Sequence, residues 1–491
     1  MEPGILIHYA KQSAPPAFRA SVFIAAEERL TWVSIFLSDF PDADVYLVGG
    51  TLRDVLLGLT PRDIDLVIRG VEIKKLKSWF GTNGAYKFVG TRFGTFKFTP
   101  HGQTNRQPID IALPRKEMVG EDHNSARTDL EILVDPHLRI EEDLSRRDFT
   151  INALAYNVAE EVVIDPFGGL FDLDAKLIQA VEDANERFFE DATRMLRALR
   201  FSSTLGFGIE EKTWNAIKHF IHLLDGTTMT EEGTHRYVIP REGIGKEFLL
   251  GFLAHPVHAL RLWKEAGALK MFLKEAAGLE HIIESGGGSR QDYLENLMNA
   301  LHRGTLLEMH GYHSSPANVF VAALISAFEG EASSIRLCRD FYLHQFPNSH
   351  PAHVDCRQVG WLVEHINDFE EVDPATIRPS VFEKQFMNER GRQLLLLMHA
   401  KCIASGMHGA ERERLHIARM MLSQFSKRIA PNGVSLPHLV TGADIESMGL
   451  VPGPVYRTLI DQVRDEQLMQ KIHTTEEALD LLRILVADAS T

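Results

Sequence analysis

Two aspartates separated by one residue, Asp63 and Asp65, follow a pair of glycines, Gly49 and Gly50, within a short stretch of chain. Paired glycines let the backbone approach phosphate groups closely, because no Cβ stands in the way. Alternate residues of a strand face the same side, so we expect both carboxylates on one face. Converging carboxylates repel each other unless a cation lies between them, and hard oxygen ligands favour Mg²⁺. The pattern predicts metal-assisted nucleotidyl or phosphoryl transfer, with Asp63 and Asp65 as the metal ligands.

Neither element is specific alone, because a Gly-Gly pair is usually a turn and an Asp-x-Asp sequence is common on surfaces. Together, with Arg53 between them, they are far more specific. The segment 46–65 resembles the nucleotidyltransferase superfamily. Within it, the chain resembles the class II tRNA nucleotidyltransferase (CCA-adding enzyme)/poly(A) polymerase family. The resemblance implies that Gly49, Gly50 and Arg53 bind the nucleotide triphosphate.

A third carboxylate, Asp110, lies in the alternating run Ile109-Asp110-Ile111-Ala112, which predicts a strand beside the one carrying Asp63 and Asp65. The resemblance implies that Asp110 completes the metal site or activates the 3′-hydroxyl of an RNA. The alternative is an ordinary aspartate facing solvent on an edge strand. Arg115 and Glu117 resemble the Arg-x-Glu of the family, which we interpret as a loop-positioning pair.

The run Arg146-Arg147-Asp148-Phe149-Thr150-Ile151-Asn152-Ala153 forms a second motif. By composition alone it reads as the charged N-terminus of a helix. A guanidinium fork suits phosphate oxygens, and carboxylate and amide groups suit ribose hydroxyls. The run matches the family pattern almost completely, which implies that Arg147, Asp148 and Asn152 bind the nucleotide.

The third motif spans residues 190–201, where Asp191, Arg194, Arg197 and Arg200 share one half of an expected helix. A generic amphipathic helix would look the same. The motif resembles the family's EDxxR element, which implies that Asp191 and Arg194 select the incoming base. An aspartate accepts from the exocyclic amino group that cytosine and adenine both carry, and an arginine donates to ring or carbonyl acceptors. Arg197 and Arg200 would make further nucleotide contacts.

Strands and helices must position these residues. Periodicity predicts short strands over 45–48, 64–68, 86–89, 95–98 and 109–113, and a helix over 72–80. Residues 116–142 are polar without clear periodicity, which predicts a long functional loop. From about residue 174 the pattern is mainly helical, with segments over 186–205, 213–224, 246–253 and 258–265.

The expected fold is a small α/β nucleotidyltransferase head, with a mixed sheet and helices, followed by a mainly α-helical neck, body and tail. The expected boundaries are a catalytic head over 1–165, a neck with the nucleotide-recognition helix over 166–275, a body over 276–430 and a tail over 431–491. Residues 165–173 resemble the linker from head to neck. Residues 439–454 resemble the family's tail motif, where an RNA-backbone contact and a structural turn are both open.

The middle of the chain could hold an HD-type phosphohydrolase domain, as in some relatives. Such a site needs clustered histidines and an adjacent His-Asp pair, and the sequence contains no such pair. We therefore interpret His310, His313, His353 and His365 as ordinary surface or core residues.

Composition and net charge exclude some classes of protein. The chain has 491 residues and a net charge of −15, which disfavours non-specific binding to long polyanions but allows a basic cleft for a structured RNA. No stretch approaches the ~18 apolar residues of a membrane span, and the N-terminus lacks a signal-peptide pattern. Three widely spaced cysteines indicate a reducing cytoplasm.

These observations predict an enzyme that adds CCA to the 3′ end of tRNA from CTP and ATP, without a template and with Mg²⁺, releasing pyrophosphate. An enzyme adding only CC or only A, or a poly(A) polymerase, would share the site. A catalytically inactive RNA-binding relative is a further alternative, against which the intact Asp63, Asp65, Asp110 and Arg194 count. The sequence leaves the oligomeric state open.

Overall fold

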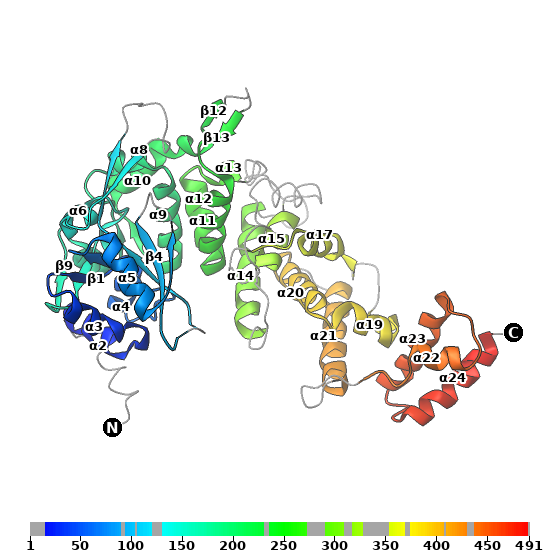
Figure 1. Cartoon of the computed structure of the whole chain (residues 1–491). Helices are drawn as coiled ribbons and strands as arrows, with labels where there is room; N and C mark the ends of the chain where they lie inside the picture. Colours follow the sequence, from blue (N-terminus) through cyan, green and yellow to red (C-terminus); the bar gives the residue numbers. More distant parts are fainter. Residues whose placement is uncertain are drawn as a thin grey trace. The chain divides into compact units, whose positions relative to one another are not determined.

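The computed structural model describes residues 15–89, 94–103, 106–119, 130–229, 235–272, 290–308, 317–327, 353–368, 374–406, 409–429 and 437–489. The chain divides into two compact units, Met1–Met271 and Phe272–Thr491. The first unit contains the strands and the three motifs expected to form the site, and the second is helical (Figure 1). The segments around His310, His313, Cys338 and residues 120–129 lie outside the described residues.

A seven-stranded mixed sheet forms the centre of the first unit, in the order β3-β4-β5-β2-β1-β8-β9. Its strands are β1 (Asp44–Val48), β2 (Asp65–Arg69), β3 (Gly84–Val89), β4 (Thr95–Pro100), β5 (Ile109–Ala112), β8 (Ala155–Asn157) and β9 (Val162–Ile164). The pair β2–β5 is parallel, and the other neighbours are antiparallel. The five predicted strands are therefore present, with ends shifted by no more than a few residues.

Helices cover the sheet, and their bounds are α2 (Pro16–Ala26), α3 (Trp32–Asp39), α4 (Gly49–Leu56), α5 (Ile73–Asn83), α6 (Ile140–Ser145) and α7 (Gly169–Ala175). An aromatic cluster packs α3 and α5 against β4, where Trp32 lies 5.2 Å from Phe98 and Phe80 lies 4.6 Å from Phe98 between ring centroids. On the other face, Tyr46, Val67 and Leu144 belong to a second buried cluster. Burial of both faces explains why β1 and β2 are almost continuously apolar.

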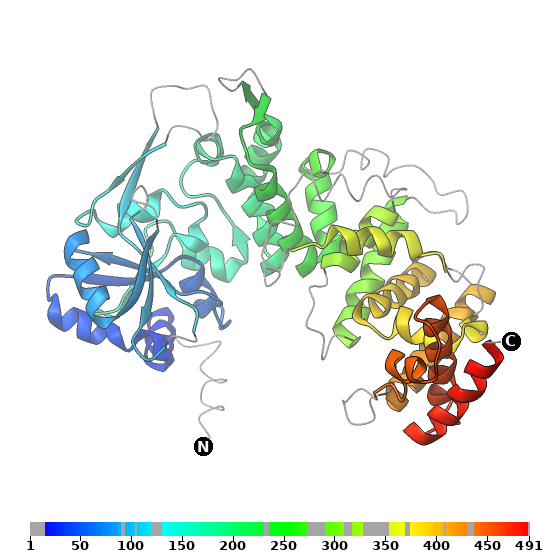
Figure 2. The ribbon, with the colours of Figure 1, turned by 45° about the vertical axis from the view of Figure 1, so that its right-hand side comes forward.

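Residues 116–142 were predicted to form one long loop, and this prediction is wrong. Strand β6 (Arg115–Val119) pairs with β7 (Leu130–Val134) in an antiparallel hairpin, and α6 follows. Figure 2 shows the hairpin beside the main sheet, ending in the segment drawn in grey. Its strands escaped prediction because β6 and β7 are short and pair across a stretch of polar residues, where local periodicity gives no signal. Glu117 lies on β6 rather than in a loop.

The helix predicted over 186–205 is also wrong in one respect, because it is two helices. Helix α8 (Ala184–Glu190) ends before Asp191, and α9 (Thr193–Leu205) begins two residues later. The side chain of Asp191 accepts hydrogen bonds from the amide of Thr193 (2.9 Å) and from its hydroxyl (2.6 Å). An aspartate that accepts from the first amide of a helix lies just before the start of that helix, so α9 begins anew instead of continuing α8.

The first unit continues as helices α10 (Glu211–Phe220), α11 (Arg241–Ala254), α12 (Pro256–Glu265) and α13 (Leu269–Phe272). Two small sheets accompany them, one of β10 (Leu177–Ile178) with β11 (Gly208–Ile209) and one of β12 (Thr227–Met229) with β13 (His235–Tyr237). Helix α9 packs on α11, and α11 packs on α12 (Figure 1). The buried ring of Trp263 meets Phe248 at 4.9 Å in this layer.

In the second unit the described helices are α14 (Arg290–Glu308), α15 (Ala317–Ser326), α17 (Cys356–His365), α19 (Pro379–Phe386), α20 (Glu389–Ala404), α21 (Ala410–Ile429), α22 (Gly442–Ser447), α23 (Pro454–Leu468) and α24 (Thr475–Ala489). The last three share a small core that includes Ile445, Leu459 and Leu482. The resembled tail motif starts α22 through a reciprocal cap, in which Asp444 accepts from the amide of Thr441 at 2.7 Å. Across the described parts of the chain, no helix is both long and apolar enough to cross a membrane.

The start of α7 gives a stability prediction. The amides of Gly169 and Leu170 donate to the Asp165 carboxylate at 2.7 and 3.0 Å. A Cβ at Gly169 would lie 2.2 Å from the backbone oxygen of Thr150, which neither rigid segment can relieve. We expect Gly169→Ala to lower the free energy of unfolding by about 1–3 kcal/mol, measured by urea unfolding.

The matched control is Gly243→Ala near the start of α11, where an added Cβ meets nothing within 4 Å. This change should leave stability unchanged or raise it by up to about 1 kcal/mol, because alanine favours the helix. Equal effects at the two positions would contradict the proposed close approach.

Candidate active site

The glycine pair forms the bend between β1 and α4. Gly49 has a φ of +61°, which favours glycine, and a Cβ there would lie 3.0 Å from Nη1 of Arg147. Gly50 follows in the first turn of α4. The hydroxyl of Thr51 donates to the carbonyl oxygen of Asp63 at 3.1 Å and accepts from the amide of Asp65 at 2.9 Å. These bonds fix the bend against the segment that carries both aspartates.

The structure places the predicted carboxylates at one end of the sheet. Asp65 is the first residue of β2, and Asp63 precedes the strand, so the expectation of a single strand carrying both is wrong. Parallel pairing of β2 with β5 puts Asp65 in register with Asp110. Side chains at paired positions of neighbouring strands lie on the same face. Asp110 therefore lies on a strand beside β2, as the sequence predicted.

Burial and like charge act together on Asp65. Desolvation raises the pKa of Asp65, and the neighbouring Asp110 and Asp63 raise it further, whereas Arg147 and the Thr51 hydroxyl oppose the rise. The site thus carries negative charge that the nearby cations do not fully compensate. Carboxylate oxygens with this electrostatic need fit a hard divalent cation. Among the described residues, however, no three His, Cys, Asp or Glu side chains are grouped as metal ligands.

The Arg146–Ala153 motif lies beside these carboxylates, but it does not start a helix as composition suggested. Arg146 follows the last residue of α6, and the 3₁₀ helix η2 (Thr150–Asn152) ends the motif. Asp143 of α6 is fully buried and binds Arg146 at 2.6 Å and Arg147 at 3.1 Å. Burial opposes ionisation of Asp143, but the two arginines outweigh it and lower its pKa.

Asp148 is buried, and its carboxylate is hydrogen-bonded to neighbouring side chains instead of being exposed for contact with a ribose. It accepts hydrogen bonds from the Asn152 amide group at 3.0 Å and from Nε of Arg197 at 2.7 Å. Burial would raise the pKa of Asp148, yet Arg197 and these hydrogen bonds lower it to about 2. Arg53 completes the group, since its Nη1 donates to the Asn152 side-chain oxygen at 2.9 Å.

The arginines of α9 differ in their surroundings. Arg194 is buried and donates to Glu190 at 3.0 Å and to the carbonyl oxygen of Arg146 at 2.9 Å. Arg197 is more exposed and binds Asp148, which raises the pKa of the guanidinium. Arg200 pairs with Glu247 of α11. The sequence placed all three on one open face, whereas the structure uses Arg194 to join α8, α9 and the Arg146–Ala153 motif.

Two residues that received no role in the sequence complete the site. The ring of Phe201 lies under the guanidinium groups of Arg53 (4.9 Å), Arg200 (4.0 Å) and Arg197 (5.2 Å). Lys97 of β4 binds Asp110 at 2.6 Å. In the sequence, a phenylalanine that follows Arg200 looks like an ordinary core residue. The partner of Lys97 becomes evident only from the strand pairing, so the sequence offered little signal for either residue.

All the predicted site residues line one open cavity of about 1280 Å³ in the first unit. Its cationic lining residues are Arg53, Arg62, Lys97, Arg115, Arg146, Arg147, Arg194, Arg197 and Arg200. Its carboxylates are Asp54, Asp63, Asp65, Asp110, Asp148 and Asp191. A polyanion such as a nucleoside triphosphate fits the basic side, and a cation fits the Asp63/Asp65 end.

The opposite pKa shifts of two aspartates give a second prediction. The pKa of Asp65 is raised in the folded state, so its ionisation costs stability above that pKa, and Asp65→Asn should raise Tm at pH 7. The pKa of Asp148 is about 2, below its unfolded value of about 3.9, so its contribution is full above pH ~4 and fades towards pH ~2. Asp148→Asn should therefore lower stability at pH 7 by on the order of 2 kcal/mol. Thermal unfolding checks both signs, and a lower Tm for Asp65→Asn would refute the charge argument.

Sequence comparison identifies relatives of the head. Residues 45–179 match the family model described as the poly A polymerase head domain. The chain is 34% identical over 238 residues to a multifunctional CCA protein of Nitrosomonas europaea, covering 48% of this chain and 50% of the relative. It is 40% identical over 183 residues to a CCA-adding enzyme of Lactococcus lactis subsp. cremoris, covering 37% and 42%. The chain thus matches half or less of the length of these relatives.

Longer matches are weaker in sequence. A multifunctional CCA protein of Laribacter hongkongensis is 27% identical over 431 residues, covering 81% of this chain and 96% of the relative. The solved Thermotoga maritima CCA-adding enzyme, complexed with tRNA, has a TM-score of 0.59 at 19% identity, covering 94% of this chain and 97% of its own. The Bacillus stearothermophilus CCA-adding enzyme, in complex with CTP, has a TM-score of 0.59 at 21% identity, covering 97% and 99%.

These likenesses confirm the predicted fold class, an α/β head followed by a helical region. Residues 45–179 therefore match the poly A polymerase head domain, and the chain is similar in sequence to CCA-adding enzymes and multifunctional CCA proteins.

Proposed function

We propose that this protein is a tRNA nucleotidyltransferase that adds the 3′-terminal CCA from CTP and ATP without a nucleic-acid template. One observation carries the proposal. The in-register carboxylates Asp65 and Asp110 share a cavity with arginines from α4, α9 and the Arg146–Ala153 motif. The names of the relatives, CCA-adding enzyme and multifunctional CCA protein, support the same activity.

In the proposed reaction, the tRNA 3′-hydroxyl attacks the α-phosphorus of the nucleotide. A new phosphodiester bond forms, the bond between the α-phosphorus and its bridging oxygen breaks, and pyrophosphate leaves. Asp110, which lies beside Asp65 and is partly exposed, would accept the hydroxyl proton. Arg53 and Arg147, beside the Gly49–Gly50 bend, would hold the triphosphate.

Asp63 and Asp65 would hold a divalent cation, for which Mg²⁺ is the choice that best matches carboxylates acting together with phosphates. When bound, the cation supplies positive charge that stabilises the attacking and leaving oxygens. The raised pKa of Asp65 supports this assignment, because the carboxylate lacks full compensation from its own neighbours.

Asp191, Arg194, Arg197 and Arg200 are proposed to recognise the nucleotide. Asp191 and Arg194 line the cavity, but both also hold the junction of α8 and α9. Base selection by Arg194 would therefore use a guanidinium whose direction is fixed by Glu190 and by the Arg146 carbonyl. Such fixed donors suit selection without a template, since they do not adapt to the wrong base.

We propose the head, neck, body and tail boundaries given above as functional parts, with the tail contacting tRNA. The few, widely spaced cysteines support a cytoplasmic location. Enzymes that add only CC or only A, and poly(A) polymerases, could use a similar cavity. The products formed on defined RNA ends distinguish these activities.

The central test uses tRNA transcripts that end before CCA, after C and after CC, each with CTP, ATP or both. We expect stepwise completion to CCA and no longer tail, read at single-nucleotide resolution. Asp63→Ala should abolish incorporation, by about a hundredfold or more, because the cation loses a ligand while the RNA surface is unchanged. RNA binding measured by filter retention should survive. A long A tail, or unchanged incorporation by Asp63→Ala, would contradict the proposal.

A second test separates base selection from architecture at α9. Arg194→Ala should relax the preference for C and A over U and G by about tenfold or more, measured in single-nucleotide competition. Glu190→Gln is the control, because it removes the ion pair of Arg194 but keeps the guanidinium. If both variants lose stability and neither changes the preference, Arg194 is only structural.

A further inference from the structure

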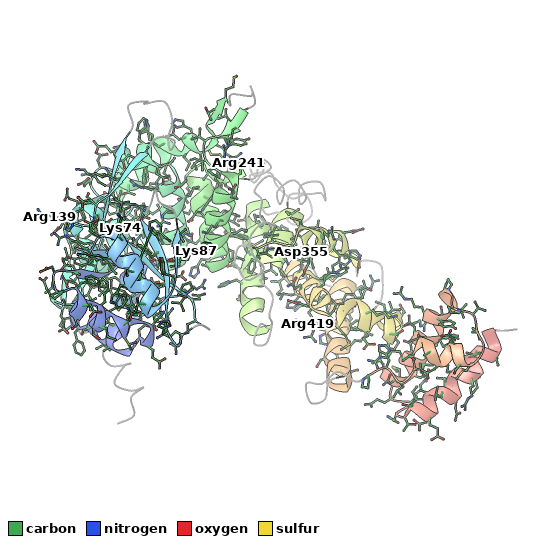
Figure 3. All side chains as sticks on the ribbon, viewed as in Figure 1. Lys74, Lys87, Arg139, Arg241, Asp355 and Arg419 are labelled. Atoms are coloured by element: carbon green, nitrogen blue, oxygen red, sulfur yellow. The ribbon has the colours of Figure 1, made fainter. Side chains whose placement is uncertain are left out.

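A row of charged side chains crosses four neighbouring strands of the sheet. Lys87 of β3 is in register with Lys97 of β4, Lys97 with Asp110 of β5, and Asp110 with Asp65 of β2. Residues paired in this way present their side chains on the same face. The row therefore runs from the sheet edge, where Lys87 is labelled in Figure 3, to the carboxylates of the cavity.

Lys97 is the point at which the sign of this row changes. Its ammonium lies 2.6 Å from Oδ1 of Asp110, and the two side chains are 45% and 32% exposed. On the neighbouring strand β3, Lys87 is paired directly with Lys97. Because like charges repel, the Lys97 ammonium is favoured to turn towards Asp110 and away from Lys87. Lys97 lines the cavity and thus faces the space where a triphosphate would lie.

The pairing with Lys97 changes what the carboxylates can do. Asp110 forms an ion pair with the Lys97 ammonium. In the described part of the chain, no three His, Cys, Asp or Glu side chains are grouped as metal ligands. Asp65, which is in register with Asp110, is half-buried. A cation entering this site must therefore compete with Lys97 for the charge of Asp110.

We propose that Lys97 is a positioning residue that holds Asp110 in the absence of nucleotide and frees its negative charge for the cation at Asp63 and Asp65 when a triphosphate offers the ammonium another anion. This proposal rests on the proposed function and deepens it. It makes the divalent-cation affinity of the carboxylates depend on bound nucleotide. By linkage, the cation must raise nucleotide affinity by the same factor.

The chemistry of lysine suits this exchange. Its ammonium is a compact charge on a flexible four-carbon stem, so it can change partners without moving the backbone. An ion pair that is partly exposed is weak, so exchanging it costs little. Arg53 and Arg197, by contrast, are held by carboxylates and by Asn152, which suits fixed contacts rather than exchange.

The test measures Mn²⁺ binding to the full chain by electron paramagnetic resonance, without RNA, in the presence and absence of α,β-methylene-CTP. In the wild type, the analogue should raise Mn²⁺ affinity. Lys97→Met should bind Mn²⁺ about fivefold or more tightly without nucleotide, because a competing charge is gone, and the enhancement by the analogue should shrink by the same factor. Lys97→Gln is a second variant that should behave alike, with Tm recorded for both.

Lys87→Met is the matched control, since it removes the neighbouring charge of the same row outside the cavity lining. It should change the Mn²⁺ affinity and its enhancement by the analogue by less than about twofold, because the exposed charge of Lys87 lies one strand further from Asp110 and is screened by solvent. Unchanged or weaker Mn²⁺ binding by both Lys97 variants would overturn the proposal, and so would an equal effect of Lys87→Met. If the expected Mn²⁺ coupling is found but no tRNA is extended, the proposed function fails while the role of Lys97 stands. If tRNA is extended and the coupling is absent, only the role of Lys97 fails.

Discussion

The parallel pairing of β2 with β5 is the constraint on which the site depends. It places Asp65 directly beside Asp110, on a face of the sheet that is otherwise apolar at Val67 and Ala112. Backbone hydrogen bonds of a central sheet fix this juxtaposition, so the two like charges cannot move apart without breaking the ladder. Burial raises the pKa of Asp65 most, and the neighbouring carboxylate of Asp110 raises it further. Because carboxylates held this close together are unfavourable alone, a cation that binds between them is strongly favoured.

Buried anions organise the opposite side of the cavity. Asp143 fixes Arg146 and Arg147, whereas Asp148 fixes Arg197 and, through Asn152, is linked to Arg53. Each buried carboxylate would be costly alone, and each is compensated by guanidinium groups that still line the cavity. Asp143 and Asp148 therefore act by orienting arginine side chains, a role different from that of Asp65 and Asp110 at the strand ends.

Helix α9 joins these parts to α11. Its first amide, that of Thr193, donates to Asp191, its Arg194 reaches back to the carbonyl of Arg146, and its Arg200 pairs with Glu247 of α11. The ring of Phe201 packs beneath three of the guanidinium groups. The same short helix thus carries cavity-lining groups and structural contacts, which explains why amphipathic periodicity could not separate the two.

The sequence by itself determined the resemblance to a nucleotidyltransferase head, the five short strands and the motif residues that meet in the cavity, because these depend on local alternation and on motif spacing. Only the tertiary structure decided that β6 and β7 form a hairpin, that Asp191 breaks one predicted helix into two, and that Arg194 is buried. It also decided that Lys97 meets Asp110. The physical reason is that register, burial and ion pairing arise between segments distant in sequence, and one chain read alone carries no record of which segments meet.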